Sequence, residues 1–321
     1  GALSARKNHD VDMPRPLNHK PGTRKGLFVP DVIETYRPEG PTRLLDFLIE
    51  SMPQRKRTNI KELLAHDQVA VNGAPTRQFD TGLSAGVEVK INLVRPFLTF
   101  RNRRLRLVFE DDDIIVVDKG YGLLSMGTDK IKEGTAYSIL RDYVKWSNPR
   151  NKIFIVHRLD RDTSGLMMFA KNQQAKETMQ HNWNNMVLER NYVAVVEGYI
   201  EDDEGTIRSY LNENAEHEVY STPRPVNADS KLAVTRYRVL DRSHGHTLVE
   251  LSLDTGRKNQ IRVHMKDLGH PIVGDRRYGA ATSPIHRLAL HARTLKFVHP
   301  NSRRPMDFST GIPAAFLSMM K

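Results

Sequence analysis

Apolar and polar positions in residues 107–321 follow both strand and helix patterns. Strand-like runs cover 107–110, 114–119, 154–156, 166–170, 192–196, 233–239 and 247–253. Helical spacing covers 136–144, 172–181 and 260–268. Adjacent strand runs without crossover helices predict an α+β fold with a mixed, largely antiparallel central sheet flanked by helices, rather than a doubly wound sheet.

A smaller α/β domain is predicted from residue 41 to residue 95. Apolar residues recur at helical spacing over 44–48, and a second short helix covers 59–65. Two runs, 68–73 and 86–91, alternate like strands. The first of them ends on Asn-Gly, which is a strong signal for a tight turn.

Two basic segments separate these domains from each other and from the N-terminus. Residues 1–40 are polar, basic and interrupted by prolines, so we expect a disordered arm that contacts phosphates or simply aids solubility. Residues 96–106 carry four arginines and are expected to link the small domain to the larger domain, 107–321.

Charge and composition narrow the class of partner. The net charge of +11 points to a polyanion, with nucleic acid as the first candidate and an acidic membrane surface as the second. The chain has no cysteine, which excludes disulfides and thiolate sites and fits a cytoplasmic protein. No apolar run approaches the ~18–20 residues of a membrane span, and no signal core opens the chain.

The most informative segment is HRLDRDTSGL, residues 157–166, which lies between two apolar runs. Both runs are expected to be short buried strands, with Asp160 in a turn between them. A carboxylate held there beside arginines is a candidate nucleophile or base. The simpler alternative is that Asp160 only pairs with Arg158 or Arg161.

This segment resembles the signature of the RluA-type pseudouridine synthases, in which His-Arg-Leu-Asp, two variable residues and Thr-Ser-Gly surround the catalytic aspartate. Segments 118–124, 190–198 and 254–264 are similar to further motifs of that family, in the same order. The resemblance covers nearly all of 107–317. It departs at Gly120, where the family usually has proline, and at 258–259, where Lys-Asn replaces Thr-His or Ser-His.

The resemblance implies a pseudouridine synthase fold and a set of site residues. Asp160 is the expected catalytic carboxylate, paired with Arg262, which would keep it ionised. Tyr192 is expected to stack on the extruded uracil, and Arg158 to fill the space that the base leaves. Arg257 is a further candidate for RNA binding. Isomerisation of uridine oxidises nothing and transfers no group, so no cofactor and no metal is expected.

Residues 41–95 resemble the S-four-type RNA-binding domain of a ribosomal protein. The similarity rests on the two short helices, the following strands and the basic start of the second helix. Arg55, Arg57 and Lys61 are therefore candidates for RNA binding. The alternative is that these cations only form a solvated helix face.

Other enzyme classes fit poorly. The 13 histidines show no metalloprotease spacing, Thr128-Asp129 stands where a phosphate loop needs Lys and Ser or Thr, and Ser164 is in no nucleophile elbow. We therefore expect a monomeric RNA pseudouridine synthase without membrane partners. Large-subunit ribosomal RNA is the expected target. The alternatives are a tRNA target, or a noncatalytic RNA-binding or ribosome-assembly protein.

Overall fold

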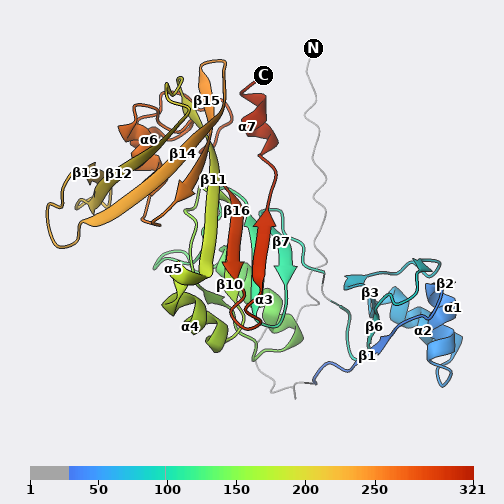
Figure 1. Cartoon of the computed structure of the whole chain (residues 1–321). Coiled ribbons are helices and arrows are strands. Elements are labelled where there is room, and N and C mark those ends of the chain that lie inside the picture. The colour runs from blue at the N-terminus through green and yellow to red at the C-terminus, as the bar shows by residue number, and fades with distance from the viewer. Residues whose placement is uncertain (1–28, 98) are drawn as a thin grey trace, which may run out of the picture. The chain divides into compact units, whose positions relative to one another are not determined.

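The computed structural model describes residues 29–97 and 99–321 (Figure 1). The chain forms two compact units: one extends to Arg101 and also includes 146–149, and the other contains 102–145 and 150–321. The division after Arg101 falls inside the segment expected to be a linker. The predicted arm lies mostly outside the described residues, because residues 1–28 are not among them.

The first unit is a small α/β domain with two short helices and two small sheets. Its elements are β1 (Ile33–Tyr36), β2 (Thr42–Arg43), α1 (Leu44–Ser51), α2 (Arg57–Ala65), β3 (Val69–Val71), β4 (Ala74–Pro75), β5 (Gly82–Leu83) and β6 (Val89–Asn92). A four-stranded antiparallel sheet has the order β1-β6-β3-β4, and β2 pairs with β5. The apolar residues of both helices are buried against β3 and β6.

Strand β1 corrects the expected boundary at residue 40. Residues 33–36 are not a disordered arm: they pair with residues 89–92 in an antiparallel ladder, and Tyr36 packs on the core of the small domain. The strand is four residues long and its partner lies more than fifty residues away, so local sequence pattern carries almost no signal for it.

The second unit is built on an eleven-stranded sheet. Its strands are β7 (Leu105–Glu110), β8 (Ile114–Lys119), β9 (Phe154–Ile155), β10 (Ser164–Ala170), β11 (Val187–Glu197), β12 (Glu204–Glu213), β13 (Val219–Thr222), β14 (Lys231–Ser243), β15 (His246–Leu253), β16 (Leu290–Val298) and β17 (Pro305–Ser309). Their order is β13-β12-β14-β15-β11-β16-β10-β8-β7, with β9 beside β10 and β17 beside β16. Among the described ladders only β10 with β16 is parallel. The predicted α+β fold with a mixed, largely antiparallel sheet is confirmed.

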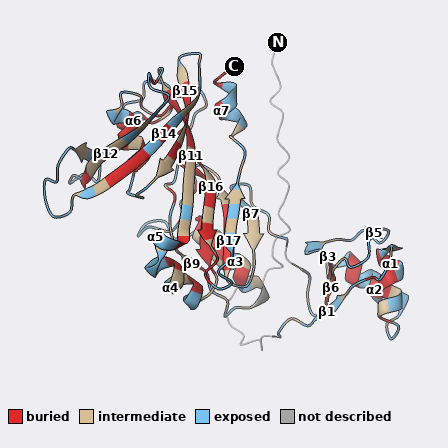
Figure 2. Ribbon diagram, viewed as in Figure 1, coloured by how far each residue is buried: buried red, intermediate tan, exposed pale blue. Residues whose placement is uncertain are grey.

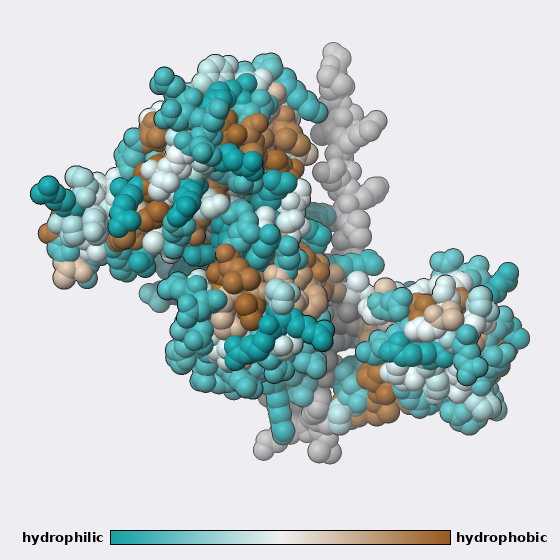
Figure 3. Space-filling view, in the orientation of Figure 1, coloured by the Kyte–Doolittle hydropathy of each residue, from teal (hydrophilic) through white to brown (hydrophobic). Residues whose placement is uncertain are grey.

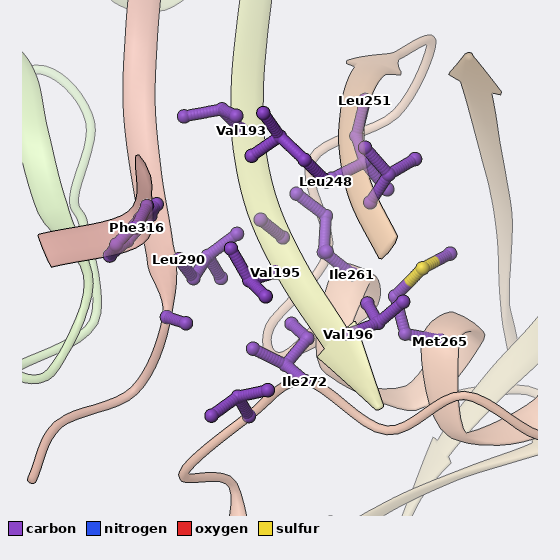
Figure 4. Close-up of a cluster of buried hydrophobic side chains, with 14 of the residues drawn as sticks. Val193, Val195, Val196, Leu248, Leu251, Ile261, Met265, Ile272, Leu290 and Phe316 are labelled. Carbon is purple, nitrogen blue, oxygen red and sulfur yellow. The ribbon is translucent and has the colours of Figure 1, made fainter. Parts of the chain in front are cut away.

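Helices cover parts of this sheet. They are α3 (Ala136–Ser147), α4 (Gln173–His181), α5 (Trp183–Met186), α6 (Gln260–Asp267) and α7 (Ala314–Ser318), with a 3₁₀ turn at Arg276–Tyr278. Side chains of β11 and β15 pack against Ile261 and Met265 of α6 and Phe316 of α7 (Figure 4). Because its two faces are covered, every residue of β10 is buried, which explains its continuous apolar sequence (Figure 2).

One of the two runs beside Asp160 differs from expectation. Strand β10 is buried as predicted, but Phe154 and Ile155 of β9 are only half-buried, because this two-residue strand pairs with the end of β10 alone. The face shown in Figure 3 is mostly hydrophilic, with separate apolar patches. No helix within 29–97 and 99–321 is long and apolar enough to cross a bilayer.

Candidate active site

Asp160 lies in the loop between β9 and β10, at the point where the sheet contains its parallel ladder. Gly165 on β10 adopts φ +119°, and a Cβ there would lie 2.1 Å from the carbonyl oxygen of Ala292 on β16. Only glycine allows this close approach of the two strands. The glycine of the Thr-Ser-Gly segment is therefore required by the backbone, and it fixes where the loop enters the sheet.

Residues on both sides of Asp160 are held through their backbone groups. The Ser125 hydroxyl donates to the carbonyl oxygen of Leu159 and accepts the Leu159 N–H at 3.2 Å. The Lys119 ammonium, with a fully buried side chain, donates to the carbonyl oxygen of Arg161 at 3.1 Å. The Gly122 N–H donates to the same oxygen at 2.8 Å. These bonds fix the loop without engaging the Asp160 carboxylate.

Burial shifts the pKa of both Lys119 and His157, two titratable side chains that bond backbone groups in and just after the loop. Burial lowers the Lys119 pKa to about 7, although the nearby Asp162 and Asp160 oppose that shift. Burial also lowers the His157 pKa to about 3, with a further contribution from the positive charge of Arg190. His157 is therefore neutral, and its Nε2 accepts the N–H of Met168 at 2.9 Å, so the proton lies on Nδ1.

The other end of the loop is tied to the C-terminal part of the chain. The Ser164 hydroxyl donates to Nδ1 of His291 at 2.7 Å and accepts from Arg287 at 2.7 Å. Nε2 of His291 in turn bonds the Thr310 hydroxyl at 2.6 Å. Burial lowers the His291 pKa to about 4, which keeps the ring neutral and able to accept at Nδ1.

Tyr192 reaches the same region from β11. The register between β11 and β16 shifts between Asn191 and Tyr192, and such a bulge redirects side chains. The Tyr192 ring is half-buried, and burial raises its pKa; Arg190 acts in the opposite direction and Asp160 raises it further. The phenol therefore stays protonated at neutral pH close to the negative charge of Asp160.

Arg262 does not form the expected direct pair with Asp160. Its guanidinium instead makes a bidentate ion pair with Asp275, at 2.8 Å for both Nε and Nη2. It also lies 4.9 Å from the centre of the Tyr278 ring. Burial alone would lower the Arg262 pKa, but the bonds and charge of Asp275, followed by the charge of Asp160, raise it. Arg262 therefore interacts with Asp160 only through the attraction of their charges, because its hydrogen bonds are made to Asp275.

Five of the predicted site residues meet at one cavity of about 670 Å³. It is lined by Arg158, Asp160, Tyr192, Arg257 and Arg262, among others. The three remaining candidates lie in the small domain. Arg57 and Lys61 are exposed one turn apart on α2, and the half-buried Arg55 precedes that helix.

Sequence reasoning missed several residues of this site. Lys119, Arg190 and Asp275 stood in segments similar to the family, but no role was assigned to them. Ser125 and Trp183 belong to no motif in the sequence, and both are far from Asp160 along the chain. Only the order of the strands in the folded sheet brings them close to it.

One group of described residues has ligand atoms close enough to hold a metal ion. Oxygen or nitrogen atoms of Asp111, Asp113 and His299 lie within 4.8 Å of one another. They are already engaged: Asp111 accepts from His299 Nε2 at 2.7 Å and from two backbone N–H groups, and His299 Nδ1 accepts two further N–H groups. The cluster therefore joins two loops, and its bonds explain it without an ion.

Comparison with known proteins shows the family of the chain. The family described as RNA pseudouridylate synthase matches residues 113–267. An uncharacterized RNA pseudouridine synthase of Bacillus subtilis, YlyB, is 34% identical over 278 residues, covering 84% of this chain and 90% of its own. Ribosomal large subunit pseudouridine synthase D of Salmonella typhimurium is 32% identical, covering 87% and 89%.

Solved structures share the fold. Human RNA Pseudouridylate Synthase Domain Containing 4 superposes with a TM-score of 0.55 at 22% identity, covering 67% of this chain and 91% of its own. Human RNA Pseudouridylate Synthase Domain Containing 1 gives 0.54 at 25% identity, covering 68% and 87%. With the Asp160 loop, the sheet topology and relatives matched over most of their length, the chain belongs to the RluA-type RNA pseudouridine synthases and is an isomerase of uridine in RNA.

Proposed function

We propose that the enzyme isomerises specific uridines in large-subunit ribosomal RNA, with Asp160 as the catalytic carboxylate. The observation that carries the proposal is the cavity in which the Asp160 loop, Tyr192 and Arg262 meet. The ribosomal target is supported by the Salmonella relative, whose printed name specifies the large ribosomal subunit. The net charge of +11 suits a polyanionic substrate of that size.

Each site residue has a role that fits its position. The target base leaves its stack and enters the cavity, as for other enzymes that act on bases. Asp160 then acts at the ribose or the base, on a loop whose backbone is already fixed, so little reorganisation is needed. Tyr192 provides an aromatic surface for the uracil, Arg262 stabilises negative charge near Asp160, and Arg158 occupies the gap in the RNA.

The small domain is proposed to bind RNA as an S-four-type module. Arg57 and Lys61 are both exposed on α2, and neither forms an ion pair with a described residue. Cations of this kind contact phosphates and increase affinity without reading sequence. Arg55 contributes from the turn before the helix.

The direct test is to map pseudouridine in RNA from cells with and without the protein. RNA is treated with a carbodiimide reagent specific for pseudouridine and read by reverse transcription. Stops in large-subunit ribosomal RNA that depend on the protein support the proposal. Dependent stops in transfer RNA alone would replace the target, and no dependent stop in either RNA would contradict the ribosomal and transfer RNA assignments together.

The role of Asp160 is tested with a matched pair of variants. Asp160→Asn should abolish isomerisation while the protein stays folded, because the substitution removes one charge and almost no volume. Asp241→Asn removes a charge from an exposed side chain on β14, outside the cavity, and should remain active. Turnover by Asp160→Asn at the wild-type rate would refute the assignment.

A further inference from the structure

A second hollow of about 210 Å³ lies beside β11 and α5. It adjoins the active-site cavity, because five residues line both: Trp183, Arg190, Leu253, Gly256 and Arg257. We call the second hollow the extension. Apart from Arg257, none of the residues that line it has been given a role above. A hollow beside the target cavity offers room for the strand that carries a flipped nucleotide.

Arg190 stands at the junction of the two spaces with its charge uncompensated. It forms no ion pair and no side-chain hydrogen bond with another residue among those that the structure describes. Its guanidinium lies 5.6 Å from the centre of the Trp183 ring. Its positive charge lowers the pKa of His157 and opposes the rise of the Tyr192 pKa. The charge of Arg190 therefore affects residues of both β11 and the Asp160 loop.

Carboxylates near the extension do not cancel this charge. Glu189 pairs with Lys296 at 3.0 Å, and Asp254 pairs with Arg236 at 2.9 Å. Both acids therefore already have a cationic partner. Arg190 is left as a permanently charged group facing the junction, since a guanidinium does not lose its proton at physiological pH.

Gly256 provides the space that the guanidinium occupies. A Cβ at this position would lie 2.6 Å from Nη1 and 2.9 Å from Nη2 of Arg190. These atoms are the far end of a flexible side chain, so an added methyl group would displace the guanidinium rather than break the backbone. The absence of a side chain at Gly256 thus lets the planar guanidinium of Arg190 lie beside open space.

We propose that Arg190 binds a backbone phosphate of the RNA strand next to the target nucleotide, and that the strand leaves the active site through the extension. The inference rests on the proposed function for the choice of RNA. A guanidinium suits a phosphodiester because it offers parallel N–H donors to two phosphate oxygens. The aromatic and apolar side chains of Trp183 and Leu188 line the extension and suit the sugar or base that follows.

The test is single-turnover isomerisation of an in vitro transcript of large-subunit ribosomal RNA, with enzyme concentration and salt varied. Arg190→Ala should raise the half-saturating enzyme concentration roughly tenfold to hundredfold, the range for loss of a charged hydrogen bond. Its salt dependence should become shallower by about 0.7–0.9 in log–log slope, which corresponds to one phosphate. Arg190→Lys should keep the slope, and Gly256→Ala should weaken binding while retaining the charge.

Two controls accompany the test, and two outcomes would overturn the inference. Arg238→Ala removes an exposed cation that pairs with Glu250 outside both cavities, and Gly311→Ala adds a methyl group to open space, also outside both. Wild-type affinity and slope in Arg190→Ala would overturn the inference. A lower maximal rate with unchanged affinity would also overturn it. If wild-type enzyme leaves this transcript unmodified, the ribosomal proposal fails, and the same variants are measured on the RNA that the mapping identifies.

Discussion

Replacing Ser125 by alanine tests whether the backbone bonds around Asp160 position the loop. The Ser125 hydroxyl bonds both the N–H and the carbonyl oxygen of Leu159, the residue that precedes Asp160. The substitution removes one oxygen atom and changes no charge. It leaves two backbone groups of the loop without their partner.

The size of the effect follows from burial. Ser125 is 2% exposed and Leu159 is 4% exposed, so water reaches neither group easily. A buried polar group without a partner costs about 1–3 kcal/mol, and two such groups give roughly 2–6 kcal/mol. Because the loop can partly relax around the missing hydroxyl, we expect the lower half of this range, a loss of about 2–4 kcal/mol in unfolding free energy. A displaced Asp160 should also slow turnover by about a hundredfold, the order expected for a shift near 1 Å.

The stability of the larger unit is measured by urea unfolding followed through Trp183. The chain has two tryptophans, and Trp146→Phe leaves Trp183 as the only one. Turnover is measured as pseudouridine formation under saturating RNA. Ser318→Ala is the control, because its exposed hydroxyl bonds one carbonyl oxygen and its loss should change stability by less than about 0.5 kcal/mol. If Ser125→Ala matched this control in both stability and rate, the proposed positioning of the loop would be wrong.

Three further predictions follow from the geometry. Asp275→Asn leaves the Arg262 cation without its carboxylate and should cost about 3–5 kcal/mol of unfolding free energy; an unchanged urea midpoint would contradict this. His157 has a folded pKa of about 3, below its unfolded value, so its stabilising contribution is complete above about pH 6.5 and is lost as pH falls toward 3, by at most about 1.4 kcal/mol per pH unit. His157→Gln should therefore show a shallower acid dependence of stability, and an identical dependence would exclude His157 as its source. Gly165→Ala would place a Cβ against the carbonyl oxygen of Ala292 and should abolish the cooperative thermal transition seen by circular dichroism; a native-like melting temperature would show that the strands can separate.

Much of the fold was predictable because its long elements have regular patterns. The apolar run of β10 and the amphipathic helices α4 and α6 were expected close to their observed bounds. Strands β1, β2 and β5 were missed, because they are short and are defined by hydrogen bonds to distant partners, and β4 was missed because it has only two residues. The long strands β12 and β16 were also not predicted. The short strands have too few residues to carry a periodicity.

The candidate site was only partly predictable, for the same physical reason. The signature around Asp160 located the loop, and family segments identified Tyr192 and Arg262. The ion pair of Arg262 with Asp275 was not expected. The resemblance to the family identifies Arg262 as a site residue, but it does not show which of two nearby carboxylates the arginine pairs with. Ser125 bonds a residue 34 positions away, a relation that only the folded sheet reveals.

The bond between Ser164 and His291 has a consequence for synthesis of the protein. It joins residues 127 positions apart, across the parallel ladder of β10 and β16. Contacts so distant in sequence form late in folding, after loop closure over the whole intervening chain. A nascent or truncated chain that lacks β16 therefore has an Asp160 loop that is held at Leu159 and Arg161 but is not anchored at Ser164. Partly made enzyme should be inactive toward RNA, and activity should appear only when the last strands have been added.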